Sequence, residues 1–312
     1  MAAIRDRTRP AAPILGLLGV VLLACGEPPP AAADEATRRF ELAIDHVGAR
    51  PVDGEVLPEA EVRRELLAAA SGLPSFVDPT RISAPALRAR IDLGEVDSAA
   101  GGRILRVDLV ATVPSGAQAV LGGELDAIIE LERHDGTLSA AEDVPVALGR
   151  AAAVLDAKVQ LATGATVEAR RLLTHEDPEI VVLALEHVAR KRWRGLADDV
   201  AALLPAGDER IAAAAIEALG AIGGPEHAAV LLKHARLADR DQAQRLYDAL
   251  ASLGGDQAQG FLEFAAREDD PTLAEVASRA LGRLRSGPAA FPEPGPEPAA
   301  ASAGARPAGH RP

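Results

Sequence analysis

The stretch ERIAAAAIEALGAIGGPEHAAVLL, residues 209–232, predicts two short helices joined by a glycine-containing turn. In its first half, Ala215 and Leu219 stand four residues apart, which is the spacing of neighbours on one helical face. Asp208, directly before the stretch, is a residue type that caps a helix by accepting hydrogen bonds from first-turn amides.

This pattern occurs four times without gaps at a 31-residue step, beginning at Asp177, Asp208, Asp239 and Asp270. Seven residues after each aspartate come Ala184, Ala215, Leu246 and Ala277, eleven residues after it come Val188, Leu219, Leu250 and Leu281, and the next residues are Ala189, Gly220, Ala251 and Gly282. The first two sets predict a buried stripe along each helix. The third set consists of small residues, so we expect it to let adjacent helices approach closely.

Second helices are predicted between these segments, at GLADDVAALLPAG, GPEHAAVLLKHARLA and GDQAQGFLEFAARED, where Val200, Leu231 and Leu262 keep one register. Two short helices per repeat, stacked in line, make an α-solenoid. We therefore expect an all-α solenoid of helical hairpins over residues 164–286. A half-repeat, TVEARRLLTHED, is expected to pair with the helix that ends near Ala162, so that the solenoid shares a core with the preceding domain.

The repeats resemble HEAT repeats of the short bacterial type, and residues 209–232 are the best match. This resemblance implies a scaffold that presents a helical surface to a partner, usually a protein. One group of HEAT-type enzymes, the deoxyhypusine hydroxylases, binds iron through repeated His-Glu pairs. Here His175 and Glu176 form the one pair in that order, and the pair does not recur at the 31-residue step. We therefore predict no enzymatic activity, no metal site and no cofactor.

Residues 38–163 predict a small α+β domain with the order β-α-β-β-β and a final helix. Alternating apolar and polar residues indicate strands at 40–47, 86–96, 103–113 and 121–133. Helices are expected at 58–73 and 144–162, where they should cover the apolar face of the sheet. Short glycine-containing turns between the last three strands favour an antiparallel meander.

The acidic residues of these strands are expected on the outward, solvated face of the sheet. They are Asp92, Glu95, Asp97, Asp108, Asp126, Glu130 and Glu132. The sequence contains no glycine-rich phosphate loop, no nucleophile elbow and no HExxH motif. We therefore nominate no catalytic residue in this domain.

Residues 1–24 have the pattern of a signal peptide, with Arg5, Arg7 and Arg9 before an uncharged apolar run at residues 11–24. This run is too short to span a bilayer. Its end, LLAC at residues 22–25, resembles the lipobox of bacterial lipoproteins, and Cys25 is the one cysteine of the chain. The resemblance implies that Cys25 is lipidated and becomes the first residue of the mature protein. Gly26 stands where an aspartate would indicate retention in the inner membrane, so we expect an exported protein at the periplasmic face of the outer membrane in a two-membrane cell.

Two further segments have compositions that do not build a core. Residues 25–37, which contain three consecutive prolines, predict a tether between the lipid and the folded part. Residues 287–312 are rich in Pro, Ala and Gly and predict a disordered tail. The net charge of −13 argues against nucleic acid as a partner, because binding to phosphates requires an excess of Lys and Arg.

One basic segment, ARKRWRG, departs from this acidic background and is the candidate protein-binding patch. It places Arg190, Lys191, Arg192 and Arg194 around Trp193, the only tryptophan. Arg170 and Arg171, in the preceding half-repeat, are expected nearby. Arg and Trp are enriched where binding energy concentrates in interfaces. The alternative is structural: Trp193 fills the space between helices, while Glu186, Asp198 and Asp199 neutralise the cations.

These observations predict a non-catalytic, membrane-anchored scaffold that assembles other envelope proteins. A second hypothesis is an envelope sensor or carrier that binds a peptide or small ligand in the groove of the solenoid. Stoichiometric protein partners in a purification from membranes would favour the scaffold. A co-purifying small molecule without protein partners would favour the carrier.

Overall fold

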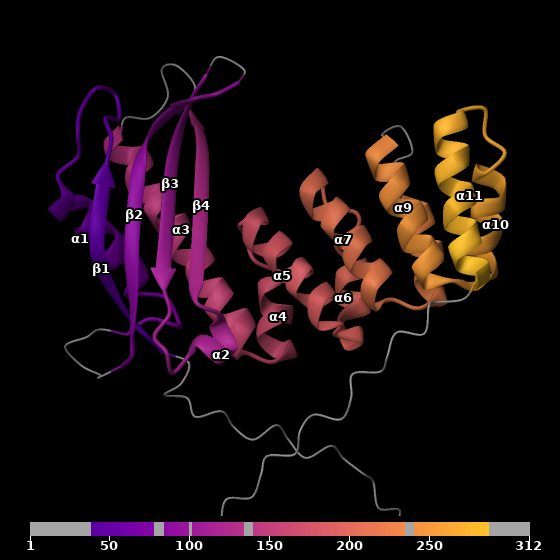
Figure 1. The fold of residues 1–312 in the computed structure, drawn as a ribbon, viewed down its shortest axis with the longest axis horizontal. Helices are drawn as coiled ribbons and strands as arrows, with labels where there is room; N and C mark the ends of the chain where they lie inside the picture. The colour runs from indigo at the N-terminus through magenta and orange to yellow at the C-terminus, as the bar shows by residue number, and fades with distance from the viewer. Residues whose placement is uncertain (1–38, 78–83, 100–101, 134–139, 235–239, 287–312) are drawn as a thin grey trace, which may run out of the picture. The chain divides into compact units, whose positions relative to one another are not determined.

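The computed structural model of the protein describes residues 39–77, 84–99, 102–133, 140–234 and 240–286. All of them belong to one compact unit, Ala36–Pro312. Within these residues a four-stranded mixed sheet comes first and a series of helices follows (Figure 1). The predicted signal peptide, Cys25, the tether, the C-terminal tail and Asp239 lie outside the described residues.

Strands β1 (Glu41–Ala49), β2 (Ala86–Asp97), β3 (Arg103–Thr112) and β4 (Glu124–Arg133) form the sheet in the order β1-β2-β3-β4. The last three strands pair antiparallel, as predicted, whereas β1 pairs with β2 in parallel. Helix α1 (Glu59–Ala70) follows β1 and makes the crossover that a parallel pair requires. A short helix, α2 (Gln118–Leu121), precedes β4. The order of elements is that of the predicted α+β domain.

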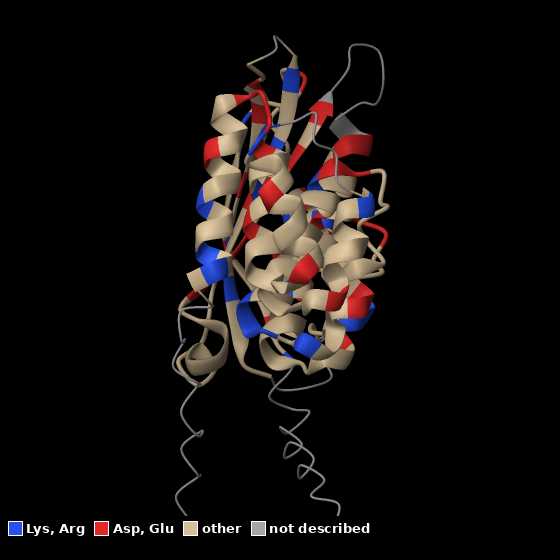
Figure 2. Cartoon of the chain, turned by 90° about the vertical axis from the view of Figure 1, so that its right-hand side faces the viewer, with Lys and Arg blue, Asp and Glu red and all other residues tan. Residues whose placement is uncertain are grey.

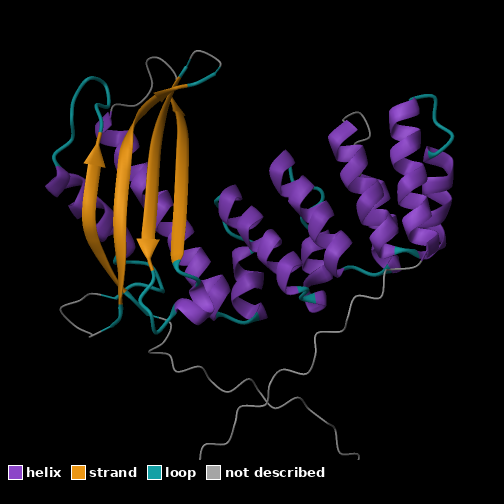
Figure 3. Ribbon diagram, viewed as in Figure 1, coloured by secondary structure: helices purple, strands orange, loops and turns teal. Residues whose placement is uncertain are grey.

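One face of the sheet carries the core, and helices α1 and α3 (Ala140–Thr163) pack against it (Figure 3). The strand residues on this face are buried, as Leu87, Ile91 and Leu109 show. The alternate residues lie on the opposite face, and Asp92, Asp108, Asp126, Glu130 and Glu132 are among them, as predicted.

The prediction was wrong for two acidic residues of β2. Glu95 stands opposite the buried Leu105, and Asp97 stands opposite Arg103, so both lie on the helix side of the sheet. The strict two-residue alternation from Leu93 fixes this side. Near the end of β2, Glu95 accepts hydrogen bonds from the Asp53 amide at 3.1 Å and from Arg103 at 3.3 Å.

Four long helices follow α4 (Thr166–Leu172): α5 (Pro178–Lys191), α7 (Glu209–Ile222), α9 (Arg240–Leu253) and α11 (Pro271–Ser286). Each begins at the same position of its repeat. Shorter helices α6 (Ala197–Ala201), α8 (Ala228–His234) and α10 (Gly255–Ala265) lie between them, and 3₁₀ turns at Arg194–Leu196 and Pro225–His227 precede α6 and α8. The long helices pack against one another in sequence order, α5 with α7, α7 with α9 and α9 with α11 (Figure 1).

The predicted buried stripe is confirmed, because all eight of its residues have 8% or less of their surface exposed. The small-residue positions have the expected role at Gly220. A Cβ atom there would lie 3.0 Å from the Cα atom of Ala249 in α9, so this glycine permits the close approach of α7 and α9. A Cβ atom at Gly282 would have no neighbouring atom within 4 Å, since α11 is the last described helix.

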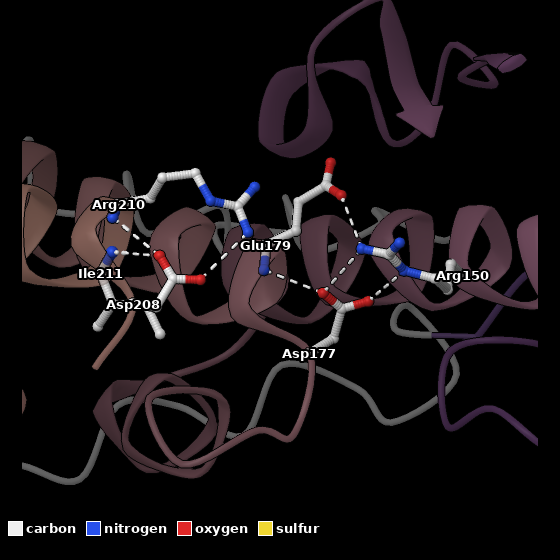
Figure 4. A network of polar contacts seen from close by, with 6 residues as sticks. All are labelled: Arg150, Asp177, Glu179, Asp208, Arg210 and Ile211. Atoms are coloured by element: carbon white, nitrogen blue, oxygen red, sulfur yellow. Dashed lines mark hydrogen bonds and ion pairs between the residues drawn. The ribbon is translucent and has the colours of Figure 1, made fainter. Parts of the chain in front are cut away.

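The predicted aspartate caps are confirmed at α5, α7 and α11. The carboxylates of Asp177, Asp208 and Asp270 accept from the amides of Glu179 at 3.0 Å, Arg210 at 2.8 Å and Thr272 at 2.9 Å. Arg150 of α3 also binds Asp177, with its Nε and Nη2 atoms 2.8 and 3.2 Å from the two carboxylate oxygens (Figure 4). The cap of α5 therefore joins the first long helix of the repeats to the last helix of the α+β part.

The exposed residues of α11, the last described helix, are mostly polar, among them Glu275, Ser278 and Arg279. Arg283 pairs with Asp248 of α9, and Arg285 lies 2.6 Å from Glu263 of α10. Figure 2 shows charged residues of both signs over the helices at this end. A polar exposed face suits a helix that no further described helix covers.

Helix α3 packs against β3, β4 and α1, and it also contacts α4 and α5. The predicted boundary between residues 163 and 164 therefore falls directly after a helix that both parts share. The buried side chains of the sheet, of α3 and of the repeats form one hydrophobic core. Among the described residues, no helix is both long and apolar enough to cross a membrane.

Candidate functional site

The C-terminal end of α5 differs from the corresponding ends of α7 and α9. These helices end at Lys191, Ile222 and Leu253, which occupy the same position of the repeat. Ile222 and Leu253 are buried, whereas Lys191 is exposed. Arg192 and Trp193 come next in the first repeat, where the other two repeats have a pair of glycines. The basic and aromatic residues of the predicted patch thus replace apolar residues and glycines.

Arg192 has a backbone conformation that favours glycine. Its φ and ψ angles are 53° and 44°, in the left-handed region, and its amide closes α5 by donating to the Ala189 carbonyl at 3.1 Å. At the equivalent positions, Gly254 after α9 also has a positive φ of 72° but a ψ of −163°, and Gly223 after α7 is extended. A residue with a side chain in this region costs roughly 1 kcal/mol. The first repeat therefore carries an arginine where the backbone favours glycine.

His187, one turn before the end of α5, is buried with 6% of its surface exposed. Its equivalents in the other repeats are also buried but are all alanine, namely Ala218, Ala249 and Ala280. The ring centroids of His187 and Trp193 are 5.3 Å apart, with the ring planes tilted by 55°. The His187 Nδ1 atom lies 3.3 Å from a guanidinium nitrogen of Arg190. The Nε2 atom is buried and has no hydrogen-bond partner among the described residues.

Burial lowers the pKa of His187 to about 4, and the positive charges of Arg190 and Lys191 act in the same direction. The imidazole is therefore neutral at pH 7. A buried polar atom without a partner costs about 1–3 kcal/mol. His187 is thus a second residue of this helix end that is unfavourable for the fold.

Trp193 is half-buried and packs against the hydrophobic core, while the four cations around it are exposed. Neither Lys191 nor Arg194 forms an ion pair with another described residue. Of the acids that the structural alternative invoked, Asp199 pairs with Arg170 and Asp198 lies 3.3 Å from His227. The structure therefore brings Arg190, His187 and Trp193 into contact and leaves a basic surface beside them.

The two arginines of α4 have other contacts. Arg170 lies 2.9 Å from Asp199 and links α4 to α6, which directly follows the 3₁₀ turn that begins at Arg194. Arg171 donates to the side chain of Gln160 on α3. Both are part of contacts between helices, and Arg171 is directed toward α3.

Sequence reasoning missed a buried polar network behind Arg171. Asp156 of α3 accepts from the Ser75 amide at 2.8 Å and from the side chain of Gln160, which Arg171 contacts in turn. Burial raises the pKa of Asp156, although these donors and the charge of Arg171 oppose the increase. The network joins the segment after α1, helix α3 and helix α4. Its signal in the sequence is the pair Asp156 and Gln160, four residues apart on an otherwise apolar helix.

No group of three or more His, Cys, Asp or Glu side chains with the arrangement of a metal site occurs in the described part of the chain. His227 and His234, which are seven residues apart, have different surroundings: His227 is buried and bonds the Gly224 amide at 3.1 Å, and His234 is half-buried at the end of α8. No protein-family model and no curated protein sequence matches this chain.

Proposed function

We propose that this protein is a lipid-anchored, non-catalytic scaffold of the bacterial cell envelope that binds a protein partner at the C-terminal end of α5. In this proposal helices α4 to α11 form a solenoid of HEAT-like hairpins, and the solenoid presents the patch formed by Arg190, Lys191, Arg192, Trp193 and Arg194. Arg170, which adjoins α6, lies at the margin of the patch.

The observation that carries the proposal is the concentration of unfavourable residues at one helix end. His187 buries an unpartnered nitrogen, and Arg192 takes a backbone conformation suited to glycine. The repeats of α7 and α9 have alanine and glycine at these positions, and their long helices have the same length of 14 residues as α5. The fold therefore does not require the costly residues. Proteins retain such residues chiefly where they serve a function.

The chemistry of the patch defines the kind of partner. Exposed guanidinium and ammonium groups beside a tryptophan favour an acidic surface on another protein, with Trp193 as the apolar centre of the contact. Opposite charges would accelerate the encounter and orient it. Arginine also forms paired hydrogen bonds with carboxylates, which fixes the geometry of binding.

Membrane attachment through Cys25 is the second part of the proposal and rests on LLAC at residues 22–25. Two or more acyl chains hold a protein stably on a membrane, since each buried CH₂ group contributes about 0.8 kcal/mol. We expect a Cys25→Ala variant to lose palmitate labelling and to leave the membrane fraction. A variant that still labels and still sediments with membranes would refute the anchor.

The patch is tested by reversing two of its charges. Lys191→Glu with Arg194→Glu changes two exposed side chains that make no ion pair with other described residues, so the fold should persist. Lys233→Glu with Arg267→Glu makes the same change of charge on α8 and directly after α10 and is the matched control. Each variant is expressed in the native organism, crosslinked, purified from membranes and compared by quantitative mass spectrometry. We expect recovery of the partner to fall roughly tenfold or more for the first pair and to stay unchanged for the control.

Equal recovery with both pairs would reject the patch. An equal loss with both pairs would assign binding to the overall charge. Far-ultraviolet circular dichroism of the purified variants establishes that both retain their helices.

A further inference from the structure

The two edge strands of the sheet, β1 and β4, differ in how far neighbouring residues cover them. At the β1 edge, a bulge interrupts the register between Ile44 and His46, and Arg63 of α1 donates a hydrogen bond to the Ile44 carbonyl. Phe40, just before β1, forms a bridge with Phe76. Bulges and side chains that cover backbone carbonyls prevent a further strand from pairing.

Among the described residues, the β4 edge has neither a bulge nor a side chain that donates to a strand carbonyl, although one lysine of α3 approaches it. Its register with β3 runs without a break from Glu124 opposite Thr112 to Arg133 opposite Arg103. The strand is ten residues long, contains no proline and pairs only with β3 in the described sheet (Figure 3). From the helix layer, Lys158 of α3 reaches one of its side chains, at 2.9 Å from Asp126. A long, straight edge of this kind is a template for another strand.

The outward face of β4 has a simple chemical pattern. Every second residue lies on this face, and all five are exposed: Glu124, Asp126, Ile128, Glu130 and Glu132. Ile128, at the centre, has 45% of its surface exposed and stands between two pairs of acids. The intervening residues point to the core, where Leu125, Ala127 and Ile129 are buried.

This pattern excludes one occupant of the edge and selects another. Two copies of β4 paired antiparallel about Ile128 would place Glu124 opposite Glu132 and Asp126 opposite Glu130. Like charges directly opposite each other in a sheet are destabilising, so a second copy of this chain is disfavoured. A strand with cations at the same positions meets a carboxylate at each of them; Asp126 already pairs with Lys158 and Glu130 with Arg106, so the gain is largest at Glu124 and Glu132.

We propose that β4 accepts an extended, basic segment of a partner protein as a fifth strand of the sheet. The segment carries Lys or Arg at its first, third, seventh and ninth residues and an apolar residue at the fifth, which stands opposite Ile128. Because this arrangement reads the same in both directions, it fits β4 in parallel or antiparallel pairing. This surface is separate from the patch at the end of α5. The patch is basic and selects an acidic partner, whereas β4 is acidic and selects a basic one.

The experiment uses the full-length protein and the nonapeptide RTRTVTRTR as the probe. Hydrogen–deuterium exchange followed by mass spectrometry reports the backbone amides of each strand. We expect the peptide to slow exchange across β4 roughly fivefold or more and to leave β1 unchanged, since added strand pairing protects edge amides. The same peptide with its backbone amides methylated retains its charges but donates no backbone hydrogen bonds, so it should give no protection.

A charge variant provides a second measurement of the same surface. Glu124→Lys with Glu132→Lys is expected to weaken peptide binding roughly tenfold or more in a titration, because two contacts become repulsive. Glu268→Lys with Asp269→Lys, in the exposed segment before α11, makes the same change of net charge and should bind as the unaltered protein does.

Three outcomes would overturn the proposal. The first is binding of RTRTVTRTR without slower exchange in β4. The second is equal binding of the methylated peptide, which would show that charge alone is responsible. The third is concentration-dependent protection of β4 in the protein alone, which would assign the edge to a second copy of the chain. All three use the unaltered protein, so they hold even if a charge variant fails to fold.

Discussion

Two buried polar side chains, Asp156 and His187, show how burial acts on single residues of this protein. Asp156 has donors from Ser75 and Gln160, so its carboxylate is satisfied although burial raises its pKa. Among the described residues, His187 has no hydrogen-bond partner at Nε2, and its pKa is lowered to about 4. The network around Asp156 joins three segments, whereas His187 makes the fold sensitive to acid.

The pH dependence of folding should therefore contain a contribution from His187. Its pKa is about 4 in the folded protein and 6.5 in an unfolded chain, so the unfolded chain binds the proton first as the pH falls. The folded protein therefore has its full stability with respect to this group above pH 6.5 and loses stability as the pH falls from 6.5 to 4. At pH 5 the loss is about 2 kcal/mol. We expect a His187→Leu variant, measured by urea unfolding at pH 7.5 and 5, to lack this loss.

His227→Leu is the control for that measurement. His227 is equally buried, but its ring bonds the Gly224 amide and lies 3.3 Å from Asp198. Leucine at this position removes those contacts, so we expect lower stability at both pH values. An unchanged pH dependence in His187→Leu would contradict the assignment.

At the residue scale, the sequence predicted what a side chain does within its own helix. Asp177, Asp208 and Asp270 were recognised as caps because capping depends on the next three residues alone. The burial of His187 was not predicted, although alanine at the three equivalent positions is a signal for it. The contact of Arg171 with Gln160 was missed because it depends on how two helices pack.

At the scale of elements, the caps of the long helices differ in what holds them. Asp208 is contacted by its own helix, through the amides of Arg210 and Ile211 and the side chain of Arg210. Asp177 also accepts hydrogen bonds from Arg150 of α3. A guanidinium nitrogen of Arg150 lies 3.5 Å from Glu179 as well (Figure 4). Burial would raise the pKa of Asp177, but Arg150 and the Glu179 amide lower it below its usual value. The cap of α5 is therefore also a contact between elements.

Removing these two caps should have unequal effects. We expect Asp208→Ala to lower the free energy of unfolding by about 1 kcal/mol, as an ordinary cap does. Asp177→Ala should cost about 2–3 kcal/mol, because it also leaves the half-buried guanidinium of Arg150 without its closest partner. Chemical denaturation at pH 7 measures both. Equal losses would show that the Arg150 contact adds nothing to the cap.

The sequence predicted the elements better than their pairing. Alternation located the four strands, and the 31-residue step located the helices, because both are local periodicities. The parallel pairing of β1 with β2 was not predicted, since it depends on the crossover through α1 rather than on either strand. The basic segment after α5 was also located, but its unusual backbone at Arg192 required the structure.

At the scale of the whole molecule, α3 connects the sheet to the repeats. It packs under β3 and β4, contacts α5, and contributes both Arg150 and Asp156 to contacts outside the sheet. Its buried residues, such as Leu148 and Leu155, belong to the same core as those of the long helices. A helix that is part of two structures cannot unfold with one of them alone. We therefore expect the sheet and the helices to unfold together.

The only tryptophan makes this expectation measurable, because Trp193 lies among the repeats. Leu109→Ala removes a fully buried side chain from β3 and should destabilise the sheet by about 2–5 kcal/mol. If unfolding is cooperative, the urea midpoint from Trp193 fluorescence shifts as far as the midpoint from circular dichroism. Leu250→Ala in α9, also fully buried, is the matched control and should move both midpoints together. A Trp193 midpoint that stays in place in Leu109→Ala would show that the repeats fold independently, and α3 would then be a linker rather than a shared core.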